Sequence, residues 1–330
     1  MLETAQFAFN AVAPILLMVL LGYLLRRIGL FTDDFLRVAN KAVFRVFIPV
    51  MLFCNVYRVE GVEAIRWDLV LVALGAVLVF FAAGLLMARL WVPDRLQKGP
   101  VIQATFRSNF AIIGLPLATS MGGSAGAAAA SLLSAFSIPL YNVFAVIALS
   151  LYTGAQRPGP GKLLRDVLRN PLIWGVLAGI AALVIRALLP EDGFRLSTSL
   201  SFLYKPISDV GTIASPLSLL VLGGQFRFSA VSGLRRQIGL GVFGRTLLCP
   251  LLGLPAVWAL TQIGVLTLGP GEYAALTALF GSPAAVSSAI MAGEMGNDEQ
   301  LAGQLVVWTS IVSMATLFAI IFCLRQAGLL

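Results

Sequence analysis

Long apolar stretches dominate this chain and limit the folds that it can adopt. Crossing a bilayer as a helix takes about 20 apolar residues, whereas membrane β-strands alternate apolar and polar residues over about ten positions. Ten continuous stretches have the helical length, at roughly residues 7–25, 38–57, 68–92, 100–121, 124–153, 171–189, 201–226, 237–264, 272–293 and 301–324. Of the 330 residues, 59% are hydrophobic and 12% are charged. The sequence therefore predicts an all-α integral membrane protein with ten transmembrane helices.

Prolines, glycines and a tryptophan recur in the two halves of the chain at one fixed offset. The offset of 167 residues (283 − 116 = 167) relates Pro49 to Pro216, Trp91 to Trp258, Gly114 to Gly281 and Pro116 to Pro283. A proline inside a helix costs about 3 kcal/mol relative to alanine, so its recurrence in apolar stretches indicates a duplication. We therefore divide the chain into a five-helix repeat over 1–152, a short cytoplasmic linker over 153–169 and a second five-helix repeat over 170–330.

The positions of the basic residues predict how the helices cross the membrane. With the N-terminus outside, thirteen lysines and arginines fall at inside connections and four at outside connections, in keeping with the positive-inside rule. Five helices per repeat then make the second repeat enter from the opposite side, which gives the inverted repeats found in alternating-access carriers. The same distribution accounts for the net charge of +8 without a nucleic-acid partner. We expect both termini to lie outside.

Glycine and proline interrupt the fourth and ninth predicted helices, at Gly114-Leu115-Pro116 and Gly281-Ser282-Pro283. A broken helix leaves backbone groups unpaired, and in hydrocarbon such breaks persist only where they are buried in protein or line a cavity. We therefore expect the two breaks to meet near the middle of the membrane. The helix N-termini that follow them would form a site for an anion. Two simple proline kinks are the alternative interpretation.

Charged and polar side chains near the breaks are the candidates for binding a substrate. Arg107 and Asn109 precede the first break, and Arg107 either attracts an anion or extends toward the membrane surface. Ser282, Ser287 and Ser288 follow the second break, although a serine in a membrane helix commonly bonds to its own backbone.

Asp209 is the acidic residue that we place inside a predicted span, which makes it the candidate for proton coupling. Lys205 lies one helical turn earlier, so a structural ion pair explains the two residues equally well. Arg245, in the eighth predicted helix, has no partner that the sequence identifies. Its role is left unassigned.

The cysteines and histidines give no sign of a metal site or a catalytic centre. Cys54, Cys249 and Cys323 lack metal-ligand spacing, and the chain contains no histidine. An intramembrane enzyme would need a nucleophile with its base, or paired carboxylates, and no such set is found. We expect neither a cofactor nor an enzymatic activity.

Four motifs resemble those of the auxin efflux carrier family. They are NFAIIGLP at Asn109–Pro116, Arg169-Asn170-Pro171, Ser208-Asp209-Val210-Gly211 and the spacing from Pro283 to Glu294. The resemblance spans almost the whole chain and is to the short bacterial members, since the long cytoplasmic loop of the plant carriers is missing. It implies a location in the bacterial cytoplasmic membrane.

The resemblance also implies a fold and a site. Such a protein is expected to share the fold of bile-acid sodium symporters, with a scaffold and a transport domain, crossed helices 4 and 9 framing the site, and a homodimeric assembly. By resemblance Asn109 is the amide that contacts the substrate, and the backbone around Gly114 and Gly281 is the anion cradle. The expected substrates are organic anions such as auxin, malonate or malate.

These observations lead to one functional hypothesis and one alternative. The hypothesis is a secondary transporter that moves small carboxylates by alternating access and binds them between the two breaks. Coupling to H⁺ or Na⁺ stays open, because unwound carbonyls can bind Na⁺ without a side-chain signature. The alternative is an anion channel or gated pore, since the same cavity would conduct if both of its gates opened together.

Overall fold

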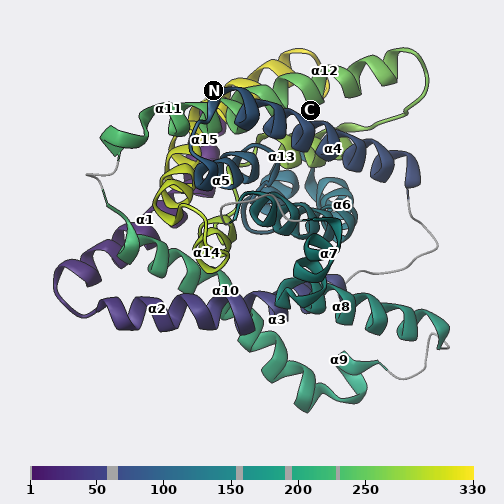
Figure 1. Ribbon diagram of the computed structural model, residues 1–330. Coiled ribbons are helices and arrows are strands. Elements are labelled where there is room, and N and C mark those ends of the chain that lie inside the picture. The colour runs from purple at the N-terminus through teal and green to yellow at the C-terminus, as the bar shows by residue number, and fades with distance from the viewer. Residues whose placement is uncertain (1, 58–65, 154–158, 190–194, 228–230) are drawn as a thin grey trace.

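The computed structural model describes the chain except for residues 1, 58–65, 154–158, 190–194 and 228–230 (Figure 1). The described residues form helices and no named strand, with one isolated β-bridge between Ser108 and Ala284. This confirms the predicted all-helical class. Part of the predicted linker, residues 154–158, lies outside the described residues.

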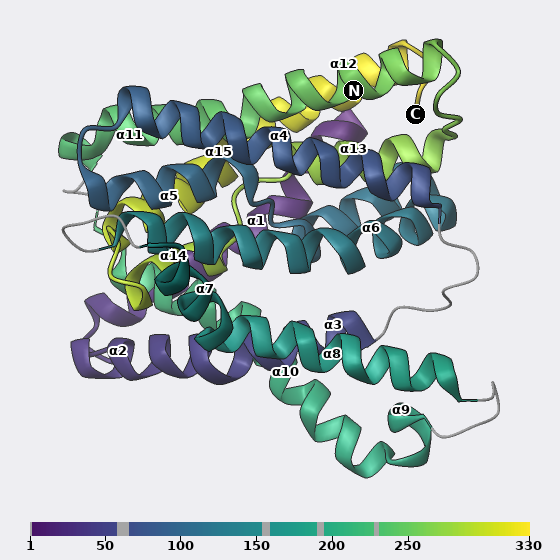
Figure 2. The ribbon, with the colours of Figure 1, turned by 45° about the vertical axis from the view of Figure 1, so that its right-hand side comes forward.

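The helices are arranged in two layers, which Figure 2 shows one above the other. The first layer contains α2 (Asp33–Ala42), the π-helical segment η1 (Val43–Phe47), α3 (Ile48–Tyr57), α8 (Pro171–Leu188), α9 (Leu196–Ser199) and α10 (Ser201–Gln225). The second layer contains α4 (Trp67–Trp91), α5 (Arg95–Phe106), the π-helical η2 (Phe110–Gly114), α6 (Leu115–Tyr152), α11 (Val231–Phe243), the π-helical η4 (Gly244–Leu248), α12 (Cys249–Gln262), α13 (Pro270–Gly281), α14 (Ser287–Glu294) and α15 (Glu299–Gln326). Helix α1 (Leu2–Arg27) packs against α10 and α15, and α7 (Pro160–Arg169) joins α6 to α8.

Five helical segments in the described part of the chain are long and apolar enough to cross a membrane. They are Trp67–Trp91, Phe110–Tyr152, Ser201–Gln225, Val231–Gln262 and Glu299–Gln326, and a shorter apolar helix covers Pro171–Arg186. Within Phe110–Tyr152, Gly123 leaves the helical conformation, with φ 59° and ψ −144°, at the point where the sequence predicts the fourth helix to end and the fifth to begin. The predicted count of ten spans is not confirmed and stays a prediction.

The first break lies seven residues earlier than predicted (114 − 107 = 7). The Gly114-Leu115-Pro116 stretch is helical, because η2 continues directly into α6, and Pro116 lies just after the π-helical turn. The chain instead leaves the helix at Arg107, after α5. The second break follows Gly281 as predicted. The offset of 167 therefore does not relate the two breaks, since the bridged residues Ser108 and Ala284 differ by 284 − 108 = 176.

Small residues allow α6 and α13 to pack closely, as the glycine- and alanine-rich start of the fifth predicted helix indicates. A Cβ atom on Gly271 of α13 would lie 2.7 Å from the Cβ of Ala125 and 2.9 Å from the backbone nitrogen of Gly126 in α6. Only glycine permits this approach. It holds α13, the half-helix before the second break, against α6, the long helix after the first break.

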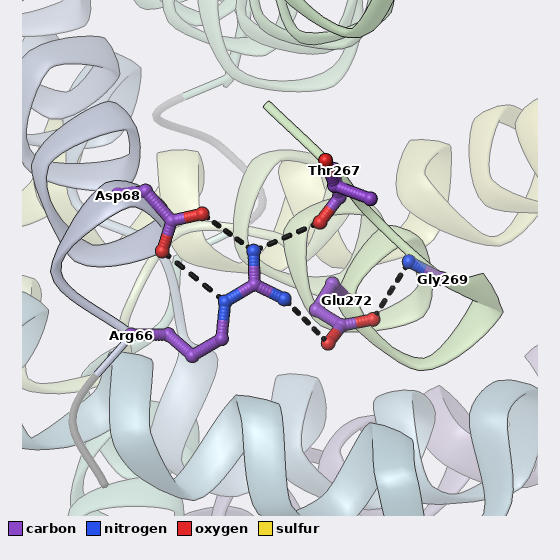
Figure 3. A network of polar contacts seen from close by, with 5 residues as sticks. All are labelled: Arg66, Asp68, Thr267, Gly269 and Glu272. Carbon is purple, nitrogen blue, oxygen red and sulfur yellow. Dashed lines mark hydrogen bonds and ion pairs between the residues drawn. The ribbon is translucent and has the colours of Figure 1, made fainter. Parts of the chain in front are cut away.

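A polar network fixes the start of α13 (Figure 3). Arg66 contacts Asp68 at the start of α4, with Nη2 2.5 Å from Oδ2, and it donates to Oε1 of Glu272 at 3.2 Å and to the carbonyl oxygen of Thr267 at 2.8 Å. The hydrogen bond to Asp68 raises the pKa of Arg66. Glu272 also accepts from the N–H of Gly269 at 2.9 Å and so caps α13. The network ties the first turn of α13 to α4.

Candidate functional site

The two helix breaks meet in the interior of the second layer. The N–H of Asn109 donates to the carbonyl oxygen of Pro283 at 2.8 Å, and the N–H of Ala285 donates to that of Arg107 at 3.1 Å. These bonds form the short antiparallel bridge, and all of its residues are buried. Each break thus satisfies backbone groups of the other, as expected for unwound segments inside a membrane protein. Two breaks thus meet in the structure, but the first lies at Arg107–Asn109 and not at Gly114–Pro116. A position near the middle of the membrane stays a prediction.

Local sequence explains the second break better than the first. Pro283 has no N–H and disfavours the helical conformation at Ser282, whose ψ is 147°. Beyond it, the N–H of Ala284 donates to Oγ1 of the buried Thr309 in α15 at 3.1 Å. The first break contains no proline, and its backbone is held open by the pairing with the second.

Arg245 holds the helix ends that lead into both breaks. Its side chain is fully buried, and its guanidinium donates to five carbonyl oxygens: those of Leu279 (2.8 Å), Phe280 (2.6 Å) and Ser282 (2.7 Å) around the end of α13, and those of Thr105 and Phe106 (3.2 Å each) at the end of α5. The sequence did not reveal these partners, because backbone carbonyls carry no residue signature. They account for Arg245 without a carboxylate.

A cavity of about 50 Å³ lies between the two layers, beside the point where the two helix breaks meet, which we call the crossing. One water requires about 10–15 Å³ on the same measure, so the cavity has room for a small ligand or a few waters. The first layer lines it with Ile48, Met51, Leu52, Asn55, Ala214, Ser215 and Ser218; the second layer lines it with Arg107, Ser108, Asn109, Ala111, Ile112, Ile138, Tyr141, Asn142, Ala285, Val286 and Ser287. Both helix breaks contribute to its wall.

Arg107 places a buried positive charge in the wall of this cavity. Its residue exposure is 4%, and its guanidinium contacts Oδ1 of Asn142 and Sδ of Met291, each at 2.7 Å. Both partners are neutral, and neither contact offsets the charge. Arg107 therefore points into the protein rather than toward the membrane surface. A buried cation held by neutral groups favours the arrival of an anion.

Two further polar groups in the wall have no partner. The amide Nδ2 of Asn109 and the hydroxyl of Ser108 are buried and form no hydrogen bond in the described part of the chain. A buried donor without an acceptor costs roughly 1–3 kcal/mol. Together with Arg107 they give the cavity a set of donors, and none of the described residues that line it carries a carboxylate. This set suits a ligand that supplies several acceptor oxygens.

The other predicted site residues divide into those that reach the cavity and those that do not. Ser287 lines it, whereas Gly114, Pro116, Gly281, Ser282, Pro283 and Ser288 do not. The hydroxyl of Ser282 donates to the carbonyl oxygen of Ala278 at 2.6 Å, which is the backbone-bonded alternative. Ser288 is buried and its hydroxyl has no partner in the described part of the chain.

Asp209 lies outside the cavity. Its carboxylate is 4.0 Å from Nζ of Lys205, and the two side chains are 69% and 79% exposed. The geometry is that of the structural ion pair that the sequence left open.

Sequence reasoning missed several cavity residues. Tyr141 and Asn142 of α6 and Ser218 of α10 line the cavity, yet they lie far along the chain from either break. A polar amide such as Asn142 inside an apolar stretch was the one available signal.

A larger cavity of about 800 Å³ opens between the layers where α1 ends and α14 ends. Its lining includes the basic residues Arg26, Arg27, Arg37 and Arg227 and the acidic residues Glu294 and Glu299. The carboxylate of Glu294 accepts a hydrogen bond of 3.0 Å from Nδ2 of Asn40 in α2. This bond links the end of α14 to the first layer.

Apolar helices long enough to cross a membrane, and a cavity at paired helix breaks whose wall includes Arg107 and Asn109, define the class of this protein as a multi-pass membrane transporter. The family model described as membrane transport protein matches residues 7–155 and 160–321, and the chain belongs to this family, the auxin efflux carriers. The resemblance drawn from the four sequence motifs is thereby confirmed.

Relatives in other organisms have the same general description. Two are each named "Uncharacterized transporter". The one from Methanocaldococcus jannaschii is 27% identical over 222 residues, which cover 65% of this chain and 67% of the relative. The one from Methanothermobacter thermautotrophicus is 26% identical over 234 residues, which cover 64% of this chain and 74% of the relative. A Rhizobium meliloti protein named "Putative malonate transporter" is 23% identical over 334 positions, covering 96% of both chains.

Proposed function

We propose that this protein is a secondary transporter of small organic anions, which bind in the cavity beside the helix crossing and are carried by alternating access. The observation that carries the proposal is the buried guanidinium of Arg107, which is 4% exposed and, among the described residues, contacts the neutral Asn142 and Met291. A carboxylate would supply the missing negative charge. Charge-assisted hydrogen bonds of this kind are about twice as strong as neutral ones.

Backbone groups add to the attraction for an anion. The segments that leave the breaks begin at Phe110 and Ser287, and Ala111, Ile112 and Ser287 in their first turns line the cavity. The first internal bond after the first break runs from Ile113 N–H to the carbonyl oxygen of Asn109, which leaves the earlier N–H groups of that turn free of helix bonds. Helix N-termini carry partial positive charge and bind carboxylates well.

The position of the cavity between the layers supports alternating access. Its walls come from both layers, so sliding one layer against the other would open it first to one side of the membrane and then to the other. We further propose that the chain forms ten spans as two inverted repeats. Corresponding half-helices support this, because α5 begins at Arg95 and α13 at Pro270, each ending at a break.

The size of the cavity and the relatives suggest the substrate class. About 50 Å³ favours a compact carboxylate over a bulky aromatic one, and the Rhizobium meliloti relative carries malonate in its name. We therefore propose short dicarboxylates as substrates, bound with one carboxylate on Arg107 and Asn109.

Transport by the purified protein in liposomes tests the proposal. Currents on a solid-supported membrane and radiolabelled counterflow would be measured with malonate, malate and indole-3-acetate. We expect saturable counterflow of a dicarboxylate that is lost in Asn109→Ala. The matched control is Gln103→Ala, because Gln103 is also a buried amide without hydrogen-bond partners but does not line the cavity.

The outcomes separate the carrier from its rivals. Conductance that does not saturate and shows no counterflow would indicate a channel. Equal activity of Asn109→Ala and the wild type would refute the assignment of the site.

A further inference from the structure

The contacts of Arg245 identify where positive charge is needed at the helix crossing. Its five acceptors are carbonyl oxygens at the C-terminal ends of α5 and α13, the two half-helices that run into the breaks. The end of a helix carries roughly half a negative charge. Two such ends converge on one side chain, so their combined charge of about −1 matches the single positive charge of one guanidinium.

Carbonyl groups at broken helices are also where transporters bind coupling cations. Half-helix C-termini and unwound carbonyls coordinate Na⁺ or interact with H⁺ in carriers built from inverted repeats. Here the carbonyl groups of Thr105, Phe106 and Ser282 already receive hydrogen bonds from a side chain that belongs to the protein. The guanidinium has five N–H donors and five carbonyl acceptors, so it is fully used.

The local structure of the chain keeps Arg245 in this position. It lies in η4, a π-helical segment between α11 and α12, and such segments are frequent at functional sites. The preceding Gly244 lets η4 approach α5, because a Cβ atom there would lie 2.7 Å from Oγ1 of Thr105. A fully buried arginine with no exposed surface has little freedom to move.

We propose that the guanidinium of Arg245 acts as a built-in cation in place of a coupling Na⁺ at the crossing, so that anion binding and transport do not require sodium. This inference rests on the proposed anion transport and deepens it, because it concerns the coupling of the same site. It also predicts that removing the side chain uncovers a site for a small monovalent cation among the same carbonyls. Arg245 is a positioning residue, since it does not line the cavity.

The first test measures cation binding by thermal unfolding of the purified full-length protein and needs no substrate. Wild type would be compared in NaCl, N-methyl-D-glucamine chloride and guanidinium chloride at equal ionic strength and at millimolar concentrations. We expect the same melting temperature for the wild type in NaCl and in N-methyl-D-glucamine chloride. Arg245→Ala should melt at a lower temperature and be selectively stabilised by guanidinium, because a ligand that binds only the folded state raises the melting temperature.

A matched control separates this role from ordinary structural support. Arg186 also donates to a backbone carbonyl, that of Tyr57 at 2.8 Å, but it lies in α8 and away from the breaks. Arg186→Ala should show no selective response to guanidinium. Arg245→Lys keeps the charge and should remain independent of sodium, and it replaces Arg245→Ala in these comparisons if the alanine variant does not fold.

The second test measures transport in liposomes with and without sodium. Wild-type uptake should proceed at the same rate in Na⁺ and in N-methyl-D-glucamine, and Arg245→Ala should lose at least about tenfold in substrate affinity, equivalent to about 1.4 kcal/mol. Partial recovery by guanidinium would support the proposal. A wild-type protein that is stabilised by Na⁺, or whose uptake falls about tenfold without Na⁺, would overturn it.

The two tests distinguish failure of the inference from failure of the proposed function. If the wild type transports none of the anions but shows the expected thermal behaviour, the proposed function fails and the cation role of Arg245 stands. If the wild type transports an anion only with Na⁺, the proposed function stands and the inference fails.

Discussion

Replacing Arg107 with glutamine should affect substrate binding and the stability of the ligand-free protein in opposite directions. The arginine side chain is buried with Asn142 and Met291 as its partners, so the ligand-free protein carries the cost of a charge that no neighbour balances. Glutamine removes the charge, but its amide nitrogen stands at the position of Nε, two bonds short of the Nη2 that contacts Oδ1 of Asn142. The hydrogen bond to Asn142 is therefore lost together with the charge.

The magnitude follows from the burial of the guanidinium. Removing one member of a buried, hydrogen-bonded charge pair costs about 2–5 kcal/mol of binding free energy, which corresponds to about 30-fold to about 5,000-fold weaker binding of a carboxylate. The ligand-free protein no longer holds an uncompensated buried charge, whose effective cost is several kcal/mol. Its melting temperature should therefore stay the same or rise.

Thermal unfolding with and without malonate measures both effects in one experiment. We expect Arg107→Gln to melt at or above the wild-type temperature without ligand and to show no shift on adding malonate. Arg186→Gln is the control for losing an arginine elsewhere, and it should keep the wild-type shift. The reasoning would be refuted if Arg107→Gln were less stable without ligand and retained the full malonate shift.

Three further substitutions test other parts of the structure. Thr309→Val leaves the buried N–H of Ala284 without its acceptor and should destabilise the protein by about 1–3 kcal/mol in chemical denaturation. Thr316→Val is the control on the same helix and should have little effect, because the Thr316 hydroxyl donates to carbonyl oxygens of that helix. Gly271→Leu forces side-chain atoms into Ala125 and Gly126 and should lower stability by about 1–3 kcal/mol or more, visible as a lower melting temperature and poor recovery of folded protein. Asp209→Asn should leave anion exchange and stability near wild type, because the exposed ion pair between Asp209 and Lys205 contributes only about 0–1 kcal/mol. Selective loss of pH-driven uptake would show instead that Asp209 carries the proton.

Membrane location, helical class and family could be read from the sequence because each depends on patterns that are local in the chain. Long apolar stretches specify helices wherever they pack, and the NFAIIGLP motif is contiguous. The R-N-P motif also has a local meaning, because Oδ1 of Asn170 accepts from the N–H of Leu172 at 2.9 Å and caps α8, with Pro171 in its first turn. Such signals depend on a few neighbouring residues.

The first helix break was misplaced because no local signal marks it. Proline predicts a break at the second site, where Pro283 ends the helical conformation, but Pro116 lies inside the continuous helical segment formed by η2 and α6. At Arg107–Asn109 the chain is opened by bonds to Pro283 and Ala285, more than 170 residues away (283 − 109 = 174). A break that depends on its partner cannot be located from one segment alone.

The partners of Arg245 were hidden for the same reason, and they give the crossing its charge. Four half-helix ends meet there, two C-terminal and two N-terminal, and a lone crossing of this kind would have no net preference for either sign. Arg245 balances the C-terminal ends by donating to their carbonyl oxygens. Arg107 lies on the cavity side and adds positive charge beside the N-terminal ends that follow the breaks. The balance of the crossing is therefore positive, and the two arginines on opposite sides of one pair of breaks support the proposal that the cavity binds an anion.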